Sequence, residues 1–149
     1  MMTKAALVLA AMLTAGLPLA APASADDSGV REIRGHGLSA CPERSLCLYQ
    51  DTDFNGTSNA RIWIITKSVP DLGDYDANDR TSSVYLNSPP DWWAGLFQDT
   101  DRVGDSITVA GGTSLANLRH VEIDVPEPHT PSRWGSFNDE ASSVQLWNP

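Results

Sequence analysis

The chain has 149 residues and carries ten Lys or Arg against nineteen Asp or Glu, a formal net charge of −9 at neutral pH. Such an acidic surface repels phosphate backbones, so we expect no nucleic-acid partner. The charge is compatible with cation binding and also with solubility alone. A chain of this length is large enough for one domain with a sizeable core.

Residues 1–25 have the pattern of a secretory signal peptide. Lys4 precedes an apolar run, and Ala23-Ser24-Ala25 forms an A-x-A cleavage site. The run is short and interrupted by a glycine and a proline, so we expect no membrane association. The sequence therefore predicts a secreted, extracellular protein that begins at Asp26. Loss of Lys4 would make it one charge more acidic.

Residues 26–40 show little apolar periodicity and are predicted to form a flexible leader. They are followed by Cys41 and Cys47, the two cysteines of the chain, in CPERSLC. Outside the cell this spacing predicts a local disulfide, which stabilises the fold by about 2.4 kcal/mol on the chain-entropy model. Zinc is the weaker alternative, because two thiolates without further nearby ligands leave a site half built.

The rest of the chain consists of short apolar or alternating runs separated by turn clusters. In chain order these runs are SLCLY, ARIWIIT, SSVYLN, GLFQD, SITVAG, HVEIDV and SSVQLW. None of them sustains a helical period. The pattern is typical of an all-β sandwich or barrel.

The chain also contains an internal repeat. YQDTDFNG at Tyr49 recurs as FQDTDRVG at Phe97, and NDRTSS at 78–83 recurs as NDEASS at 138–143. The two spacings differ by about a dozen residues, which predicts an insertion in the second copy, within the Pro-rich segment 121–133. Each copy alone would expose an apolar face, so we expect the two to pack into one sandwich.

The segment that starts at Asp51, DTDFNG, begins like an EF-hand calcium loop. The twelfth loop position, which needs a Glu, is Ile62, and the flanking runs are β-branched and aromatic. Asn-Gly between such runs predicts a β-hairpin turn. The EF-hand is therefore rejected, while other modes of calcium coordination stay open.

The paired motifs resemble the βγ-crystallin superfamily. There each Greek key motif opens with Y/F-x-x-x-x-F/Y-x-G, and calcium-binding microbial members also carry N/D-N/D-x-x-S/T-S. The first copy fits both patterns; in the second copy Arg102 stands where Phe54 stands in the first. Gly56 and Gly104 end the two hairpin patterns, where a sharply folded turn needs positive φ.

The resemblance implies an all-β fold in which two Greek key motifs form a single βγ-crystallin-like sandwich. We expect this domain over 41–149, with motif one at 46–87 and motif two at 95–148. CPERSLC directly before motif one is similar to the start of secreted bacterial metalloproteinase (peptidase) inhibitors with a crystallin-like fold. The second disulfide of those inhibitors has no counterpart here.

The resemblance also implies up to two calcium ions, Ca²⁺, bound by oxygen atoms of both motifs. The implied ligands are the backbone carbonyls of Gln50, Arg80, Gln98 and Glu140, the hydroxyls of Ser82 and Ser142, and the carboxylates of Asp79 and Asp139. Which copy supplies which ligand to which ion stays open. The alternative is that these Asn, Asp and Ser side chains only cap turns.

Gly104-Asp105-Ser106 resembles the nucleophile block of GDS-type hydrolases. Such enzymes need a histidine base, and His129 lies in the Pro-rich insertion without a matching D-x-x-H. We therefore expect no enzymatic activity. Two functions remain for a monomeric protein: a calcium-stabilised, non-catalytic binding or structural module, or an inhibitor of a secreted metalloproteinase that acts through an exposed loop.

Overall fold

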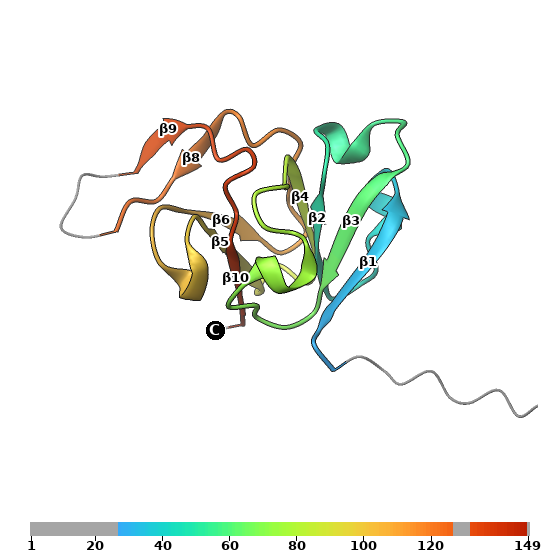
Figure 1. Ribbon diagram of the computed structural model, residues 1–149, viewed down its shortest axis with the longest axis horizontal. Coiled ribbons are helices and arrows are strands. Elements are labelled where there is room, and N and C mark those ends of the chain that lie inside the picture. The colour runs from blue at the N-terminus through green and yellow to red at the C-terminus, as the bar shows by residue number, and fades with distance from the viewer. Residues whose placement is uncertain (1–26, 127–131, 149) are drawn as a thin grey trace, which may run out of the picture.

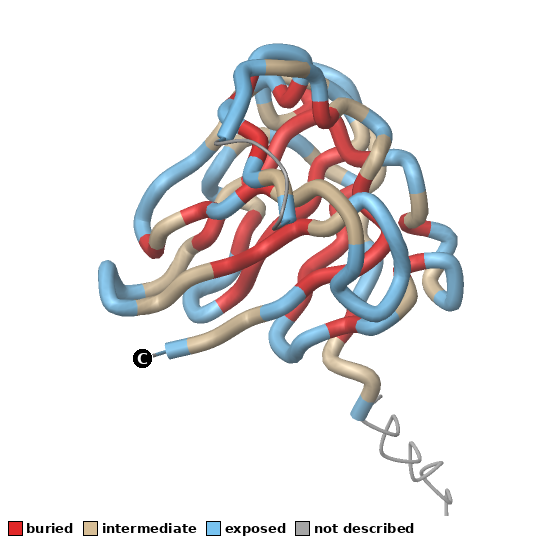
Figure 2. Tube along the Cα trace, turned by 90° about the vertical axis from the view of Figure 1, so that its left-hand side faces the viewer, coloured by how far each residue is buried: buried red, intermediate tan, exposed pale blue. Residues whose placement is uncertain are grey.

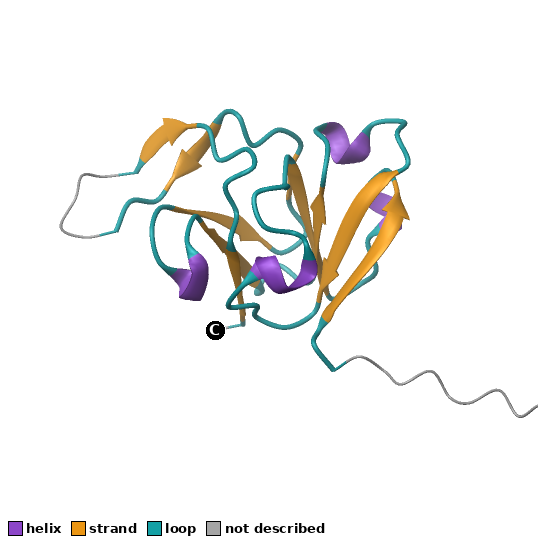
Figure 3. Cartoon of the chain, viewed as in Figure 1, coloured by secondary structure: helices purple, strands orange, loops and turns teal. Residues whose placement is uncertain are grey.

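The structure, a computed structural model, describes residues 27–126 and 132–148 (Figure 1). The predicted signal peptide and its cleavage site, residues 1–25, lie outside the described residues. Within the described ranges the regular elements are strands and short 3₁₀ turns, without an α-helix (Figure 3). No helix in this part of the chain is long and apolar enough to cross a membrane. The predicted all-β class is confirmed.

The larger sheet has the strand order β1-β3-β2-β4-β7, with antiparallel neighbours. Its strands are β1 (Val30–Gly35), β2 (Ser45–Tyr49), β3 (Ala60–Ile65), β4 (Ser83–Asn87) and β7 (Ser114–Leu115). The second sheet has the order β10-β5-β6 and is also antiparallel. Its strands are β5 (Trp93–Phe97), β6 (Ser106–Ala110) and β10 (Ser143–Trp147).

The remaining elements are short. The strands β8 (Val121–Ile123) and β9 (Arg133–Gly135) pair as a separate ribbon. The 3₁₀ turns are η1 (Leu38–Ala40), η2 (Asp53–Asn55), η3 (Leu72–Tyr75) and η4 (Thr100–Arg102). Strand β8 lies within the predicted insertion and β9 begins at its last residue; the ribbon projects from one end of the molecule in Figure 1. Residues 127–131 of the insertion lie outside the described residues.

Each motif places one extended segment in the sheet of the other motif. In the larger sheet, Leu115 of motif two pairs with Val84 of motif one. In the second sheet, Val69 of motif one exchanges two backbone hydrogen bonds, of 2.8 and 2.9 Å, with Val144 of motif two. Because Val84 and Val144 occupy matching positions in the repeat, the exchange is symmetric. This arrangement confirms two Greek key motifs joined in one sandwich.

The main core fills the space between the two sheets (Figure 2). Alternate strand residues point into it, as β6 shows with buried Ile107 and Val109 on either side of exposed Thr108. Trp63 is the largest fully buried side chain, and its indole N–H donates to the Tyr75 carbonyl at 3.2 Å. Burial of each large apolar side chain contributes about 1.5–3 kcal/mol, which is what holds the two motifs together.

The prediction of a flexible leader over 26–40 is wrong for much of that segment. Strand β1 pairs with β3 along its whole length, from Val30 opposite Ile65 to Gly35 opposite Ala60. The sequence VREIRG concealed this strand because its charged side chains break the apolar alternation. Such charges suit an edge strand, where they discourage pairing with another chain. The backbone partner is the free edge of β3, supplied by residues about thirty positions away.

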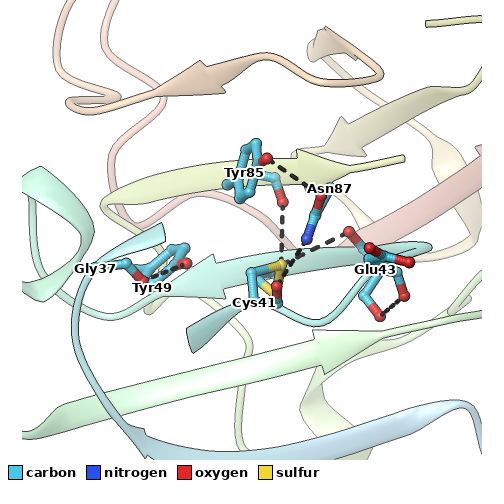
Figure 4. Close-up of a disulfide and its surroundings, with 8 residues drawn as sticks. Gly37, Cys41, Glu43, Tyr49, Tyr85 and Asn87 are labelled. Atoms are coloured by element: carbon cyan, nitrogen blue, oxygen red, sulfur yellow. Dashed lines mark hydrogen bonds between the residues drawn. A yellow bond between two sulfur atoms is a disulfide. The ribbon is translucent and has the colours of Figure 1, made fainter. Parts of the chain in front are cut away.

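The predicted disulfide between Cys41 and Cys47 is confirmed, with an S–S distance of 2.05 Å. Both cysteines belong to a second apolar cluster on the outer face of the larger sheet (Figure 4). In this cluster the Tyr49 hydroxyl donates to the Gly37 carbonyl at 3.1 Å, and the Asn87 amide donates to the Cys41 carbonyl at 2.8 Å. Segment 36–44 is thereby fastened over the outer face of the sheet.

Candidate functional site

The two hairpins that precede the Asn-Asp motifs share part of their folded backbone. Phe54 and Arg102 occupy matching left-handed conformations, with φ of 56° and 63°, and the predicted positive φ is found at Gly56 and Gly104. Phe54 packs edge-on against Tyr49 with ring centroids 5.5 Å apart. Arg102 has no ring for such a contact, yet it has the same left-handed conformation. The hairpins differ at the next residue, where Asn55 has a φ of 68° and Val103 a φ of −109°. The turn therefore does not depend on the aromatic side chain.

A serine of each Asn-Asp motif fastens the hairpin of its own motif. The Ser83 hydroxyl donates to the Asp51 carbonyl at 2.6 Å and accepts from the Phe54 N–H at 3.0 Å. In motif two the Ser143 hydroxyl donates to the Asp99 carbonyl at 2.6 Å and accepts, at 2.9 Å, from the N–H at the position that matches Phe54. These hydroxyls are fully committed to structure, so they are unsuited to bind a ligand.

The preceding serine of each motif contacts an aspartate of the other motif. The Ser82 hydroxyl lies 3.4 Å from Asp139 Oδ1, and the Ser142 hydroxyl lies 3.5 Å from Asp79 Oδ1. We call the cluster around Ser82 and Asp139 site I, and the cluster around Ser142 and Asp79 site II. The sequence left open which motif supplies which ligand; the structure places one serine and one aspartate of different motifs in each site.

The backbone holds both aspartates in this crossed position. The Asp79 N–H donates to the Ala141 carbonyl at 3.0 Å, and the Asp139 N–H donates to the Thr81 carbonyl at 2.9 Å. Both aspartates are left-handed, with φ of 54° and 55°. Asp tolerates this conformation better than most residues do. The crossed pairing is therefore built into the main chain.

The first residue of each motif orients the neighbouring carboxylate, a role that the sequence analysis missed. Asn78 Nδ2 donates to Asp79 Oδ2 at 2.7 Å, and Asn138 Nδ2 donates to Asp139 Oδ2 at 2.6 Å. One carboxylate oxygen is thereby held by the amide while the other lies by the serine. The repeated Asn before each Asp was the signal that could have indicated this role.

The predicted backbone ligands Gln50 and Gln98 lie beside the two serines. The Ser82 N–H donates to the carbonyl of Tyr49, the residue before Gln50, at 2.9 Å. The Ser142 N–H donates to the carbonyl of the residue before Gln98 at 2.8 Å. Gln50 therefore belongs with site I and Gln98 with site II. The other two predicted backbone ligands, Arg80 and Glu140, each lie two residues before one of these serines.

The side chains of Arg80 and Glu140 face different charges. Arg80 forms a 3.2 Å ion pair with Asp76. The pKa of Asp76 is lowered, first by its hydrogen bond from Arg61 and next by Arg80. The pKa of Glu140 is raised, first by burial and further by the negative charges of Asp105 and Asp79, against an opposing effect of Arg133.

The donor set of the two sites is one of hard oxygen atoms. In the ranges that the structure describes, no three His, Cys, Asp or Glu side chains gather closely enough to hold a metal by themselves. A cation at site I or site II would therefore be bound by one aspartate, one serine hydroxyl, backbone carbonyls and water. Calcium accepts such mixed oxygen ligands, whereas zinc prefers nitrogen and sulfur.

The Gly104-Asp105-Ser106 segment has the geometry of an ordinary strand entry. Ser106 exchanges two backbone hydrogen bonds, of 2.9 and 2.7 Å, with Asp124, and the Asp105 carboxylate accepts from Arg133 at 2.8 Å. His129, the histidine considered as a base, lies outside the described residues. The described surroundings of Ser106 thus give it a backbone role at the start of β6.

The β8–β9 ribbon carries an exposed aromatic side chain. Trp134 in β9 is 66% exposed, and its ring stacks on His120 with centroids 5.1 Å apart. A separate shallow depression is lined by Phe97, Arg102, Val103 and neighbouring residues of the segment that follows β8. This exposure was not predicted from the sequence.

A family of known proteins matches the first part of the domain. The model of peptidase inhibitor family I36 matches residues 36–109. This range begins before the disulfide and ends within β6. The match covers 74 of the 149 residues, and over this range the chain is similar to that family. A match to an inhibitor family and a crystallin-like fold both fit the expectation that the chain is not an enzyme. A comparison with curated protein sequences found no match.

One solved structure shares the fold of this chain, and two further structures are similar to it. A structure described in terms of the evolution of the eye lens βγ-crystallin domain fold has a TM-score of 0.56 and 22% identity, with 80% of this chain and 98% of that chain covered. A βγ-crystallin from Ciona intestinalis has a TM-score of 0.49 and 25% identity, covering 69% and 99%. Spherulin 3a from Physarum polycephalum has a TM-score of 0.48 and 23% identity, covering 78% and 96%.

Proposed function

We propose that this chain is a secreted, non-catalytic βγ-crystallin-like module that binds up to two calcium ions, one at site I and one at site II. The observation that carries the proposal is the crossed pairing of serine and aspartate. Ser82 lies 3.4 Å from Asp139 Oδ1, and Ser142 lies 3.5 Å from Asp79 Oδ1. A residue that only caps a turn bonds within its own turn. A contact between two motifs is instead what a shared cation requires.

The chemistry of the two sites supports calcium over other cations. Calcium takes six to eight oxygen ligands in a flexible geometry, whereas magnesium requires a small, regular octahedron. Each site offers one carboxylate, one hydroxyl and carbonyls of residues whose backbones are held by hydrogen bonds. A bound ion would join the two motifs and therefore stabilise the whole fold.

The test is a calorimetric titration of chelator-treated protein with calcium, combined with thermal melting. Extracellular calcium modules bind at roughly 10⁻⁴ to 10⁻³ M, and saturation at 100 times the dissociation constant stabilises by about 2.7 kcal/mol per site. Millimolar calcium should supply part of this and raise Tm by several degrees, since about 1 kcal/mol corresponds to roughly 3–5 °C at this size. Magnesium should have little effect.

Matched serine variants locate the effect. Ser82→Ala and Ser142→Ala should each reduce the rise in Tm, and the double variant should nearly abolish it. Ser39→Ala removes an exposed hydroxyl in η1, outside both sites, and should leave the rise unchanged. Absence of binding heat, together with an unchanged Tm at about 10 mM calcium, would show that both Asn-Asp motifs only cap turns.

Secretion as a monomer is part of the proposal. Secretion is supported by the match to an inhibitor family and by the Cys41–Cys47 disulfide, since disulfides persist in oxidising compartments. The intact mass of the exported protein should correspond to a chain that starts at Asp26 and contains one disulfide. A mass that includes residues 1–25 would contradict this part, and a dimer in size-exclusion chromatography would contradict the monomer.

Inhibition of a secreted metalloproteinase is the second candidate function. Two observations favour it: the match to peptidase inhibitor family I36 and the exposed Trp134 on a ribbon that projects from the sandwich. Exposed tryptophans often dominate the binding energy of interfaces. Purified protein should inhibit at least one member of a panel of secreted metalloproteinases. Trp134→Ala should weaken inhibition at least tenfold, while Val103→Ala, at another exposed apolar position, should not.

A further inference from the structure

The outer face of the second sheet carries three aromatic side chains. Trp93 and Phe97 belong to β5, and Trp147 of β10 is paired directly with Trp93. Because successive strand residues point to opposite faces, these rings face away from Ala94 and Leu96, which are buried in the main core. All three aromatic side chains are only partly buried. We call this surface the outer aromatic face.

Gly95 lies between these rings and lets them approach the sheet closely. A Cβ atom at this position would lie 3.0 Å from a ring carbon of Phe97 and 3.3 Å from a ring carbon of Trp147. Both rings therefore reach over the glycine, which is buried although it has no side chain. One side of each ring packs on the sheet and the other faces solvent. Together the rings form a platform on the outside of the sandwich.

Uncharged polar side chains lie beside this platform. Gln145 of β10 and Thr108 of β6 are paired with Gly95 from its two neighbouring strands, and both are exposed. The Thr108 hydroxyl donates to the Asp124 carboxylate at 3.1 Å, so its oxygen is left to accept from a ligand. An amide and a hydroxyl are thus available between aromatic rings.

The repeat provides a comparison with a sheet face that the chain itself covers. Ile64 of the larger sheet occupies the position that matches Thr108. Tyr85 occupies the position that matches Gln145. Both belong to the apolar cluster on the face over which segment 36–44 is fastened. The second sheet has polar groups at these positions, so its outer face is suited to a hydrated ligand rather than to an apolar protein segment.

The charges around the outer aromatic face favour a neutral ligand. The two polar side chains paired with Gly95 are uncharged. The shallow depression at the Phe97 end is lined by one cation, Arg102, and one anion, Asp124. The chain as a whole has a net charge of −9, which repels anionic polymers.

We propose that the outer aromatic face binds a neutral polysaccharide whose sugar rings are joined through equatorial bonds, as in cellulose and chitin. Such a sugar ring has apolar C–H groups on both faces and polar groups around its edge. The faces stack on Trp93, Phe97 and Trp147, while the edge groups exchange hydrogen bonds with Gln145 and Thr108. Equatorial linkage keeps the polymer extended and flat, as a platform on a sheet requires.

The test measures retention of the purified exported protein by insoluble cellulose and chitin, and tryptophan fluorescence during titration with short soluble fragments of each. Wild-type protein should bind at least one polymer, with an affinity that salt does not change because the ligand is neutral. Trp93→Ala and Trp147→Ala should each weaken binding by about tenfold or more, and Gln145→Ala several-fold. Leu38→Ala, at an exposed apolar position in η1, should bind like wild type.

The outcomes distinguish a polysaccharide site from a protein interface. Because Gln145 is exposed, Gln145→Ala tests the face even if the tryptophan variants unfold, which their Tm reports. Failure to bind either polymer, unchanged binding by Gln145→Ala, or retention that disappears at high salt would overturn the proposal. So would a metalloproteinase inhibition that Trp147→Ala abolishes in a protein that neither polymer retains. Calcium binding at site I and site II is not required, so the two proposals fail independently.

Discussion

Thr81 differs from its counterpart in the repeat in a way that bears on stability. Its side chain is fully buried and its hydroxyl has no hydrogen-bond partner among the described residues, while the matching position holds Ala141. A buried, unpaired hydroxyl costs about 1–3 kcal/mol. Thr81→Val keeps the shape and removes the cost, so it should stabilise by about 1 kcal/mol and raise Tm by roughly 3–5 °C.

Differential scanning calorimetry without calcium measures the effect of Thr81→Val. Thr113→Val is the matched control, because the Thr113 hydroxyl is exposed and donates to the Ala110 carbonyl at 2.6 Å. The control should not stabilise the fold. A lower Tm for Thr81→Val than for wild type would mean that the hydroxyl is satisfied after all.

Tyr49 is expected to make the fold sensitive to alkaline pH. Burial, and secondarily Tyr85, raise the pKa of Tyr49 from 10.0 to about 12. The folded state thus holds this proton more tightly than the unfolded state. The resulting contribution to the free energy of unfolding is full below pH 10 and is lost as pH rises through about 12. The free energy of unfolding, measured with urea at successive pH values, should fall over this window. Tyr49→Phe should show a shallower fall; an equally steep one would contradict the assignment.

The hairpins are the elements whose stability can be tested most directly. Ser83 and Ser143 are fully buried, and each makes the same two hydrogen bonds to its hairpin. Ser83→Ala and Ser143→Ala should each lower the free energy of unfolding by about 1–3 kcal/mol, because a backbone donor and acceptor lose their partner. The two costs should be similar. Urea unfolding measures them, with exposed Ser114→Ala in β7 as the control that should change little.

Most strands and hairpins could be predicted, because the same sequence pattern occurs in both copies of the repeat. The strands of both motifs, the disulfide and the positive φ at Gly56 and Gly104 follow from local patterns. Arg102 in the place of Phe54 left the second hairpin uncertain in sequence. The structure shows that backbone and Ser143 hydrogen bonds fold it without a ring.

Other features depend on partners that are distant in the sequence and could not be predicted from local patterns. Strand β1 has a weak apolar pattern and exists because β3 offers a free edge. The crossing of Asp79 and Asp139 follows from the exchange of extended segments between the sheets, which no local pattern reports. The exposure of Trp134 likewise depends on where the β8–β9 ribbon lies.

At the scale of the whole molecule, the disulfide fastens segment 36–44 over the outer face of the larger sheet. Because it closes a short loop of the unfolded chain, its loss should cost about 2.4 kcal/mol and lower Tm by roughly 10 °C. A Cys41→Ala, Cys47→Ala double variant tests this by calorimetry and avoids the slow reduction of two buried sulfurs. The calcium-dependent rise in Tm should persist in the variant, since neither cysteine belongs to site I or site II. A Tm equal to that of wild type would show that the bond contributes nothing.

The exchange of Val69 and Leu115 between the sheets also determines how the fold is assembled. A single motif on its own would lack one neighbour strand and could regain it only from a second copy. In this chain the second copy is attached through the short segment 88–92. Pairing is therefore intramolecular, with an effective concentration on the order of millimolar rather than that of free protein. Two motifs that would otherwise form a weak dimer are expected to fold together at any dilution.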